Sequence, residues 1–411
     1  MHMRKYNYRA ARFIMIMLAA FFFACVLHPA ASVQAKKLKT YTISPKSKPA
    51  DKSLLKNKSY NTTTKHYFLL QTYMDKFEKA GGGKLILKKG TYYLNCTVSI
   101  PSNVTIILQN GVVLKKTYKN SPMKKSPIMF RFCSPKMHKK TMHNKVKEND
   151  KGYKKHNGVK NVKIIGQGNA TIDIGGKKKM YAFFMGHNKN CTISGIKFKN
   201  LKDGHFIELD AGKNITIENC SFSNLTGKSS KEAINLDTPD VTTGGFNQPW
   251  SSMDKTPNED VTIRNCKFEK VTRAIGTHKY SYGHPHKNIT IENCTFKGKY
   301  ADDNFIIRAL NWNGGTIRGC TFRDSYVAID GPGARDITIC NNSFTHNSYR
   351  VIYFYPYKGS GQPVIMPHLT SSMTYGNTYS DVGDNVIRNV TGWNSSTQSR
   401  IWSQYDAWPL K

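Results

Sequence analysis

An internal repeat limits the architectures open to this chain. Six copies of Thr-Ile-x-x-x-x-Phe align without gaps, and they start at residues 192, 216, 262, 290, 316 and 338. Successive starts lie 22 to 28 residues apart, except for one step of 46 that holds a coil plus a loop. This period is typical of one coil of a solenoid, in which each coil buries its apolar side chains only against its neighbours.

A second β-type segment follows each copy and carries an isoleucine in register. These isoleucines are Ile207, Ile234, Ile275, Ile307, Ile329 and Ile352. Because side chains alternate along a strand, the Ile and Phe columns are expected to face inward. We therefore predict an all-β fold, a single-stranded right-handed parallel β-helix with a three-sided cross-section, and expect it to be a monomer.

The cysteines of the repeat fall in one column and are predicted to be small buried residues rather than disulfides. Cys220, Cys266, Cys294 and Cys320 occupy the same position of successive copies. Free cysteine behaves as a small apolar side chain, and the chain has no CxxC spacing. Asn219, Asn265 and Asn293 precede three of them, at a predicted bend where asparagine tolerates left-handed backbone.

The N-terminal region predicts export. Four basic residues precede an apolar run from Phe13 to Leu27, and Val33-Gln34-Ala35 is a small-x-small cleavage site, so residues 1–35 are predicted to be a signal peptide. Residues 36–60 are rich in lysine and are predicted to form a flexible basic leader. The β-helix domain is predicted over 61–411, with a capping helix at 64–80 that ends at three glycines, a basic loop at about 119–160, and a C-terminal cap from about 370.

The charge indicates an anionic partner. The chain carries a formal net charge of +36, and removal of the four basic signal residues leaves 36 − 4 = +32. Such a field concentrates polyanions. The export signal and the lack of a nucleic-acid module exclude nucleic acid, and the apolar run is too short to span a bilayer. An acidic polysaccharide or anionic cell-wall polymer, met outside the cell, is the expected partner.

The chain resembles the pectate-lyase-like superfamily of right-handed parallel β-helix proteins over roughly residues 60–356. The resemblance lies in Gly-Gly-Gly-x-Leu-x-Leu-x-x-Gly-Thr-Tyr from Gly81, in Gly166-Gln167-Gly168 with Thr171-Ile172-Asp173, and in the Asn-Cys-x-Phe coils. It implies the β-helix fold and an activity on polysaccharides, as a lyase or as a polygalacturonase-like hydrolase, without selecting the family.

The outward positions beside the isoleucine column form a candidate site. One and three places after each isoleucine stand, coil by coil, Glu208 and Asp210, Asn235 and Asp237, Gly276 and His278, Arg308 and Leu310, Asp330 and Pro332, and Tyr353 and Tyr355. Two places before the isoleucines stand His205, Glu232 and Arg273. A polar side chain facing the core is costly, so these three are expected to turn outward.

Aromatic residues are expected to border this face and to stack on sugar rings. They are Trp250, Tyr280, Tyr282 and Trp312, with Tyr353 on the face itself. His205, Glu208 and Arg273 complete the predicted substrate-binding set.

Two cleavage reactions fit these residues, and β-elimination is slightly preferred because it requires an acidic sugar. A lyase needs a cation to neutralise the uronic carboxylate and a base to remove the neighbouring proton. Arg308 is the predicted neutraliser, and His278, with Lys279 or Tyr280, is the predicted base. Glu208 and Asp237 are candidate Ca²⁺ ligands, and no other cofactor is expected.

A glycoside hydrolase is the alternative, and a non-catalytic glycan-binding or cell-wall β-helix is a third reading. Hydrolysis needs two carboxyl groups across the bond, for which Asp237 with Asp330 or Glu232 are the candidates. Asn235-Leu236-Asp237 is similar to the Asn-x-Asp of polygalacturonases. The chain lacks that family's Asp-Asp pair, Gly-His-Gly and Arg-x-Lys, and also the Arg-x-Pro-x-x-Arg of pectate lyases.

Overall fold

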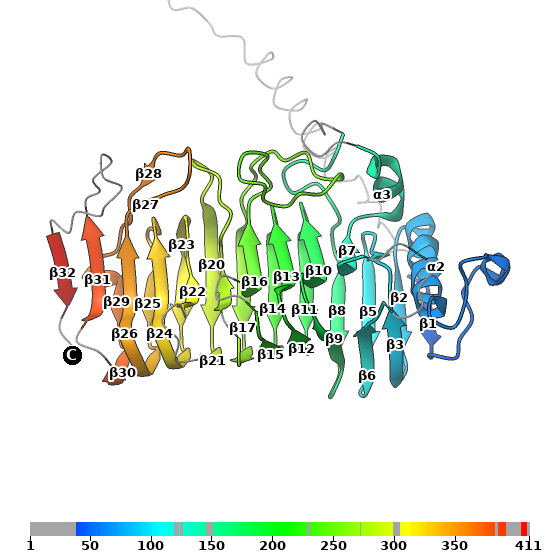
Figure 1. The fold of residues 1–411 in the computed structure, drawn as a ribbon, viewed down its shortest axis with the longest axis horizontal. Helices are drawn as coiled ribbons and strands as arrows, with labels where there is room; N and C mark the ends of the chain where they lie inside the picture. Colours follow the sequence, from blue (N-terminus) through cyan, green and yellow to red (C-terminus); the bar gives the residue numbers. More distant parts are fainter. Residues whose placement is uncertain are drawn as a thin grey trace, which may run out of the picture. The chain divides into compact units, whose positions relative to one another are not determined.

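The computed structural model is a parallel β-helix and confirms the predicted all-β architecture (Figure 1). It describes residues 38–118, 123, 126–144, 151–227, 231–271, 273–298, 305–382, 385–391 and 404–408. The chain divides into Met1–Leu38 and Lys39–Lys411, and the second unit holds all the elements considered below. The predicted signal peptide lies outside the described residues.

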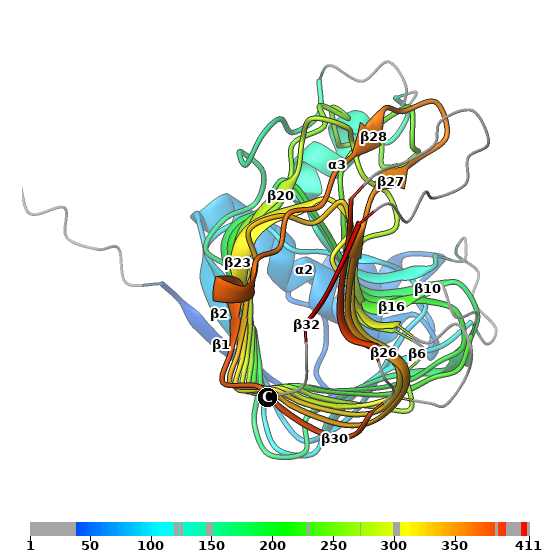
Figure 2. The same cartoon turned by 90° about the vertical axis from the view of Figure 1, so that its left-hand side faces the viewer.

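Each coil contributes to up to three faces, as the view along the axis shows (Figure 2). Face A carries the Thr-Ile segments, and all its strand pairs are parallel. Its strands are β1 (Thr40–Ile43), β2 (Gly83–Leu87), β5 (Val104–Leu108), β8 (Lys163–Gly166), β11 (Lys189–Ser194), β14 (Lys213–Glu218), β17 (Glu259–Arg264), β20 (His286–Glu292), β23 (Trp312–Arg318), β25 (Thr338–Cys340) and β29 (Thr374–Tyr375).

Face B carries the repeat phenylalanines. Its strands are β3 (Gly90–Leu94), β6 (Val112–Lys116), β9 (Thr171–Lys177), β12 (Lys197–Leu201), β15 (Ser221–Leu225), β18 (Lys267–Glu269), β21 (Thr295–Lys297), the first halves of β24 (Thr321–Pro332) and β26 (Ser343–Tyr355), and β30 (Thr378–Val382).

Face C carries the second isoleucine column and the candidate site. Its strands are β4 (Val98–Ser99), β7 (Ile128–Phe132), β10 (Met180–Gly186), β13 (Gly204–Asp210), β16 (Glu232–Asp237), β19 (Arg273–Gly276), β22 (Phe305–Arg308), the second halves of β24 and β26, and β31 (Asn385–Thr391). At its end β32 (Gln404–Trp408) pairs with β31 in the antiparallel sense.

The core consists of the predicted columns. The isoleucines of face C pair directly from Ile207 through Ile352, and all six are buried. On face B the rings of Phe198, Phe222, Phe268, Phe296, Phe322 and Phe344 stack with successive centroids 4.7 to 5.0 Å apart. The four repeat cysteines are buried and free, as predicted.

Asparagines shape the bends, as predicted. Asn219, Asn265 and Asn293 have φ values of 55°, 53° and 52°. A side-chain amide ladder runs along the bend that leads into face A, where Asn161 donates to Asn103 at 2.9 Å and Asn214 donates to Asn190 at 3.1 Å. Each amide thereby satisfies the amide of the next coil.

The ends differ from the sequence prediction in part. The capping helix is present as α2 (Lys65–Ala80), which covers the N-terminal end of the core (Figure 1). The leader is not wholly flexible, since β1 pairs with β2 and η1 (Lys52–Lys56) follows it. Likewise the segment from 370 begins with η3 (Ser371–Met373) and continues the coils through β29, β30 and β31.

The predicted basic loop contains ordered elements where it is described. Strand β7 and helix α3 (Pro135–Thr141) lie within it, and Ser134 caps the helix by accepting from the Met137 amide at 3.0 Å. Among the helices of the described ranges, none combines the length and apolarity required to cross a bilayer.

The phenylalanine stack should dominate the stability of the central coils. Phe268→Ala removes a buried ring between two stacked neighbours and should lower the free energy of unfolding by about 3–5 kcal/mol. Denaturant or thermal unfolding followed by circular dichroism measures this loss. Tyr375→Ala, at a side chain that is 54% exposed, is the control and should change little; equal effects would contradict the column model.

Candidate functional site

The site is built from outward-facing positions of face C. On each coil one residue points outward, the next two point into the core, and the following one points outward again. On β16 these are Glu232, the buried pair Ala233 and Ile234, and then Asn235. His205, Glu232 and Arg273 flank these core pairs and are only 1%, 0% and 6% exposed, so they are more buried than the sequence predicted.

Register brings the acids together. Glu208 pairs with Asn235, and Asp210 pairs with Asp237, across β13 and β16. His278 and Lys279 follow β19, the next strand. Because adjacent strands are about 4.8 Å apart, these side chains converge within three coils.

A pocket of about 280 Å³ opens over these strands. The loop between β16 and β17 forms its wall with Gly244, Gly245 and Phe246, and Lys231 and Lys279 add positive charge. Its remaining lining residues are Pro127, Ile128, Tyr181, Phe184, His205, Glu208, Asp237, Asn247, Gln248 and His278.

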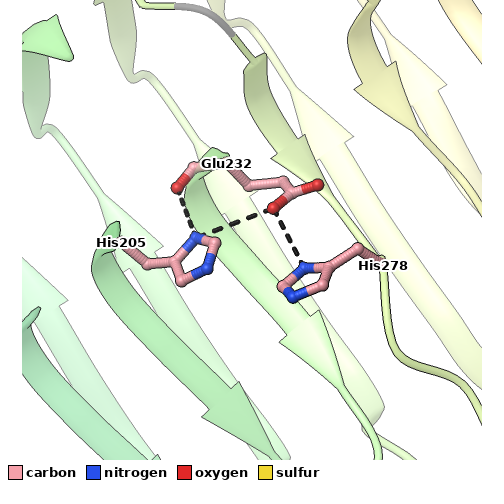
Figure 3. Close-up of side chains that lie close together, drawn as sticks. All are labelled: His205, Glu232 and His278. Atoms are coloured by element: carbon pink, nitrogen blue, oxygen red, sulfur yellow. Dashed lines mark hydrogen bonds and ion pairs between the residues drawn. The ribbon is translucent and has the colours of Figure 1, made fainter. Parts of the chain in front are cut away.

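A charged network supports one side of the pocket (Figure 3). Glu232 Oε1 accepts from Arg273 at 2.7 Å, and Glu232 Oε2 lies 3.2 Å from His278 Nδ1. His205 Nδ1 donates to the Glu232 carbonyl oxygen at 2.7 Å, and the two imidazole rings stack with centroids 5.3 Å apart. Glu232 thus fixes both histidines.

Charge pairing shifts the pKa values of this network in opposite directions. Burial alone would raise the pKa of Glu232, but Arg273 and then His278 outweigh it, so this pKa lies below its usual range. Burial would lower the pKa of His278, but Asp237 and Glu232 raise it to about 9. Burial lowers the pKa of His205 to about 3. At neutral pH Glu232 is therefore an anion, His278 a cation and His205 neutral.

The carboxyl groups of Glu208, Asp210 and Asp237 accept different numbers of hydrogen bonds. Asp237 Oδ1 accepts from the backbone amides of His278 and Lys279 at 3.0 and 2.9 Å, and Asp237 Oδ2 lies 3.5 Å from His278 Nε2. Glu208 accepts one hydrogen bond, from Asn235 at 3.1 Å, while both oxygens of the buried Asp210 accept none. Donors stabilise the ionised form, so the negative charge belongs on Asp237.

The pKa values of the other two carboxyls are raised, and Glu208 is therefore protonated near neutral pH. Burial, and then the charge of Asp237, raise the pKa of Glu208 to about 8. Burial, followed by Glu208 and Asp237, raises the pKa of Asp210 well above its usual value. Burial also raises the pKa of Asp237, against the pull of His278. Like charges on neighbouring coils cannot all ionise, so Glu208 is an acid beside an anion.

Two sets of side chains have the donors for a cation. Glu208 and Asp237, the predicted Ca²⁺ ligands, offer carboxylate oxygens as calcium requires, with Asp210 beside them. His205, Glu232 and His278 offer ligand atoms within 4.8 Å of one another, a nitrogen-rich set of the type that suits zinc. In that set Arg273 already neutralises Glu232, and a metal would have to displace the proton of His278.

Arg308 and Asp330, the predicted cation and second carboxylate of the cleavage site, do not line the pocket. Arg308 donates to Asp330 at 2.6 Å, one strand beyond β19. Asp330 is three strand spacings from Asp237, roughly 14 Å, which is too far for paired glycosidase carboxyls. The pairing of Asp237 with Asp330 is therefore wrong, and Arg308 is engaged in an ion pair instead of facing the pocket.

Most predicted aromatic contacts are also corrected. Trp250 and Trp312 are both 0% exposed; Trp250 packs against Phe246, and Trp312 donates to Thr277 Oγ1 at 2.9 Å, so neither reaches a sugar. Tyr280 is buried and its hydroxyl accepts from the Gly359 amide at 2.9 Å. Tyr353 is buried under other rings, whereas Tyr282 is 48% exposed.

Sequence reasoning did not select several pocket residues. Tyr181 on β10 is in register with His205. Phe183 takes the place of the isoleucine on this coil, so extending the isoleucine column by one coil would have identified Tyr181. Phe246 stacks on Phe184 with centroids 4.9 Å apart, and this contact comes from a loop without a repeat signal.

Comparisons with known proteins agree with the fold. Residues 252–395 match the family model described as right handed beta helix region. Plasmin and fibronectin-binding protein A of Streptococcus pneumoniae (strain ATCC BAA-255 / R6) is 31% identical over 160 residues, which are 34% of this chain and 21% of that protein. The chain thus spans about a fifth of the length of this relative.

Two kinds of solved structure are similar. The crystal structure of PfbA, a surface adhesin of Streptococcus pneumoniae, is 21% identical with a TM-score of 0.51, covering 79% of this chain and 76% of that one. A mutant tailspike protein of E. coli bacteriophage HK620 in complex with a hexasaccharide is 14% identical with a TM-score of 0.50, covering 80% and 61%. At these identities the likeness concerns the fold. The chain therefore has the fold of a parallel β-helix, with residues 252–395 matching the right-handed family model.

Proposed function

We propose that this protein acts outside the cell on an acidic glycan and hydrolyses its glycosidic bonds in the pocket over β13 and β16. The observation that carries the proposal is that Glu208 and Asp237 line one pocket in unlike surroundings: Asp237 accepts from two backbone amides, whereas burial raises the pKa of Glu208 to about 8. A glycosidase requires such a pair, one carboxylic acid and one carboxylate. Lys231, Lys279 and the His278 cation favour a substrate that carries carboxylate or sulfate groups.

In this mechanism Glu208 is the general acid. Its proton passes to the glycosidic oxygen as the bond to the anomeric carbon breaks. Asp237 acts on the opposite side, either by taking a proton from the attacking water or as the nucleophile. Glu232 and Arg273 hold His278 in place, and His278 with two backbone amides keeps Asp237 ionised.

Hydrolysis is preferred here to the β-elimination favoured by the sequence. The predicted base, His278, is protonated up to a pH of about 9 because it lies between Asp237 and Glu232. A protonated imidazole is a poor base. The predicted neutraliser, Arg308, is paired with Asp330.

Non-catalytic glycan binding is the second candidate, and the relatives favour it. PfbA is described as a surface adhesin, and the tailspike structure holds a hexasaccharide. A bacterial surface location agrees with the export signal predicted at the N-terminus. In this case the pocket would retain its ligand without cleaving it, and the plasmin and fibronectin in the relative's name would be protein partners to test.

Removal of either carboxyl should abolish cleavage. Glu208→Gln and Asp237→Asn should each lower the rate by about 10² to 10⁴, since each removes one proton-transfer group. The assay follows new reducing ends released from polygalacturonate, alginate, hyaluronan and neutral glucans, in parallel with ultraviolet absorbance for unsaturated uronic ends. Glu269→Gln, an exposed glutamate on face B, is the matched control. An increase in absorbance that does not depend on Glu208 would favour the lyase reaction instead. If neither reducing ends nor absorbance increased, glycan binding would be the remaining function.

The pH profile should report Glu208. Its proton is present below a pKa of about 8 and is lost above it, so hydrolysis should fall as the pH rises through about 8. Rates between pH 6 and pH 10 on folded protein, checked by circular dichroism, measure this limb. The residual rate of Glu208→Gln should lack it. A wild-type rate that stays flat beyond pH 9 would contradict the role of Glu208 as the acid.

Metal removal separates the roles of the carboxyls. A Ca²⁺ ion held by Glu208 and Asp237 would ionise Glu208 and remove the acid. The proposed hydrolysis therefore does not use Ca²⁺, and its rate should be unchanged after treatment with EDTA. Activity restored by added Ca²⁺ would show instead that these carboxyls are ligands, as the lyase interpretation expects. Calorimetric titration of Ca²⁺ into the wild type and Asp237→Asn identifies the residue concerned.

A further inference from the structure

The outward columns of face C continue beyond the pocket and change their chemistry. The column of Glu208 and Asn235 passes through Gly276 to Arg308, Asp330 and Tyr353 on β22, β24 and β26. The column of His205 and Glu232 passes through Arg273 to Phe305, Val327 and Arg350. Acids and imidazoles thus give way to rings and guanidinium groups on the same continuous surface.

We name this surface the aromatic–arginine strip. It consists of Phe305, Arg308, Tyr326, Tyr349, Arg350 and Tyr357. The guanidinium of Arg308 lies 5.8 Å from the Phe305 ring and 5.6 Å from the Tyr357 ring, and that of Arg350 lies 4.2 Å from the Tyr349 ring. Tyr326 and Tyr349 stack with centroids 4.6 Å apart. Each guanidinium therefore lies against a flat ring.

The strip has a rigid base and an accessible upper layer. Tyr353 and Tyr355 stack 4.5 Å apart and are 6% and 4% exposed, so they form the base. Tyr349 is 38% exposed, and Phe305, Tyr326 and Tyr357 are half-buried. An exposed ring beside a guanidinium offers an apolar plane for a sugar ring and a planar donor for its carboxylate or sulfate.

The strip is joined to the pocket at two points. Arg273 donates to Glu232 in the pocket network, and its guanidinium lies 5.5 Å from the Phe305 ring. Tyr280, on the loop after His278, lies 5.7 Å from Tyr357 on the hairpin of β27 (Tyr357–Lys358) and β28 (Val364–Ile365), which rises beside face C (Figure 1). From β16 to β26 there are four strand spacings, on the order of 19 Å, the length of several sugar units.

From this geometry we infer that the glycan held in the pocket extends along the strip toward the C-terminal coils. The inference rests on the proposed function and adds to it that the substrate is a chain of several sugars whose acidic groups meet Arg350, while Arg308, paired with Asp330, supports the rings of Phe305 and Tyr357. Binding should then depend on chain length, because only a long chain reaches from Asp237 to Tyr349.

The experiment measures dissociation constants by calorimetry with the Glu208→Gln protein, which keeps long chains intact. The probes are oligomers of galacturonate, mannuronate and hyaluronan with three and eight sugars, together with their carboxyl-reduced forms. Tyr349→Ala should weaken binding of the eight-sugar probe by about tenfold and leave the three-sugar probe unchanged. Tyr349→Phe keeps the ring and should restore binding, and Tyr375→Ala on β29 is the matched exposed control.

Arg350→Lys is a second variant, which keeps the charge but loses the planar contact, and circular dichroism confirms that each variant is folded. The inference would be overturned if short and long probes bound with equal affinity, if neither variant changed binding, or if no acidic probe bound. Equal binding of the carboxyl-reduced probes would overturn its anionic part. If the strip variants weaken binding while Glu208→Gln still cleaves polymer, the inference about the strip is supported and the proposed hydrolysis is wrong. If Glu208→Gln abolishes cleavage while the strip variants bind normally, the hydrolysis is supported and the inference about the strip is wrong.

Discussion

The structure depends on parallel, in-register hydrogen bonding between successive coils. Each strand of face C places identical positions of neighbouring coils about 4.8 Å apart, so a side-chain type that recurs in the sequence becomes a continuous column. Isoleucine and phenylalanine columns fill the interior, and asparagines at left-handed positions turn the corners. The register that builds the core also sets the spacing of every side chain on the outer surface.

That spacing has a cost where the columns carry charge. Glu208, Asp210 and Asp237 lie on two adjacent strands in buried positions, and the low dielectric makes three negative charges there unfavourable. The protein distributes protons and partners unequally. Asp237 receives backbone donors and His278, whereas burial raises the pKa values of Glu208 and Asp210. The repulsion that the register imposes is thus the origin of an acid and a carboxylate in one pocket.

The same surface changes character along the axis without a change of backbone. Near β16 it is acidic and bordered by the loop that carries Phe246; at β24 and β26 it is aromatic. Neighbouring coils therefore present different side chains at a constant spacing.

The amino-acid pattern was sufficient to predict the repeat-based part of this protein. The period placed Ile207 through Ile352 and the phenylalanines in columns, and counting from them predicted the register of Glu208, Asn235 and Asp237, because strand alternation is local and regular. Tertiary structure decided what lies outside the repeat. Only folding shows that Trp250 and Trp312 are buried, that Asp330 is bound by Arg308, and that β1 joins the sheet. These outcomes depend on contacts between segments far apart in the sequence, for which local pattern carries no signal.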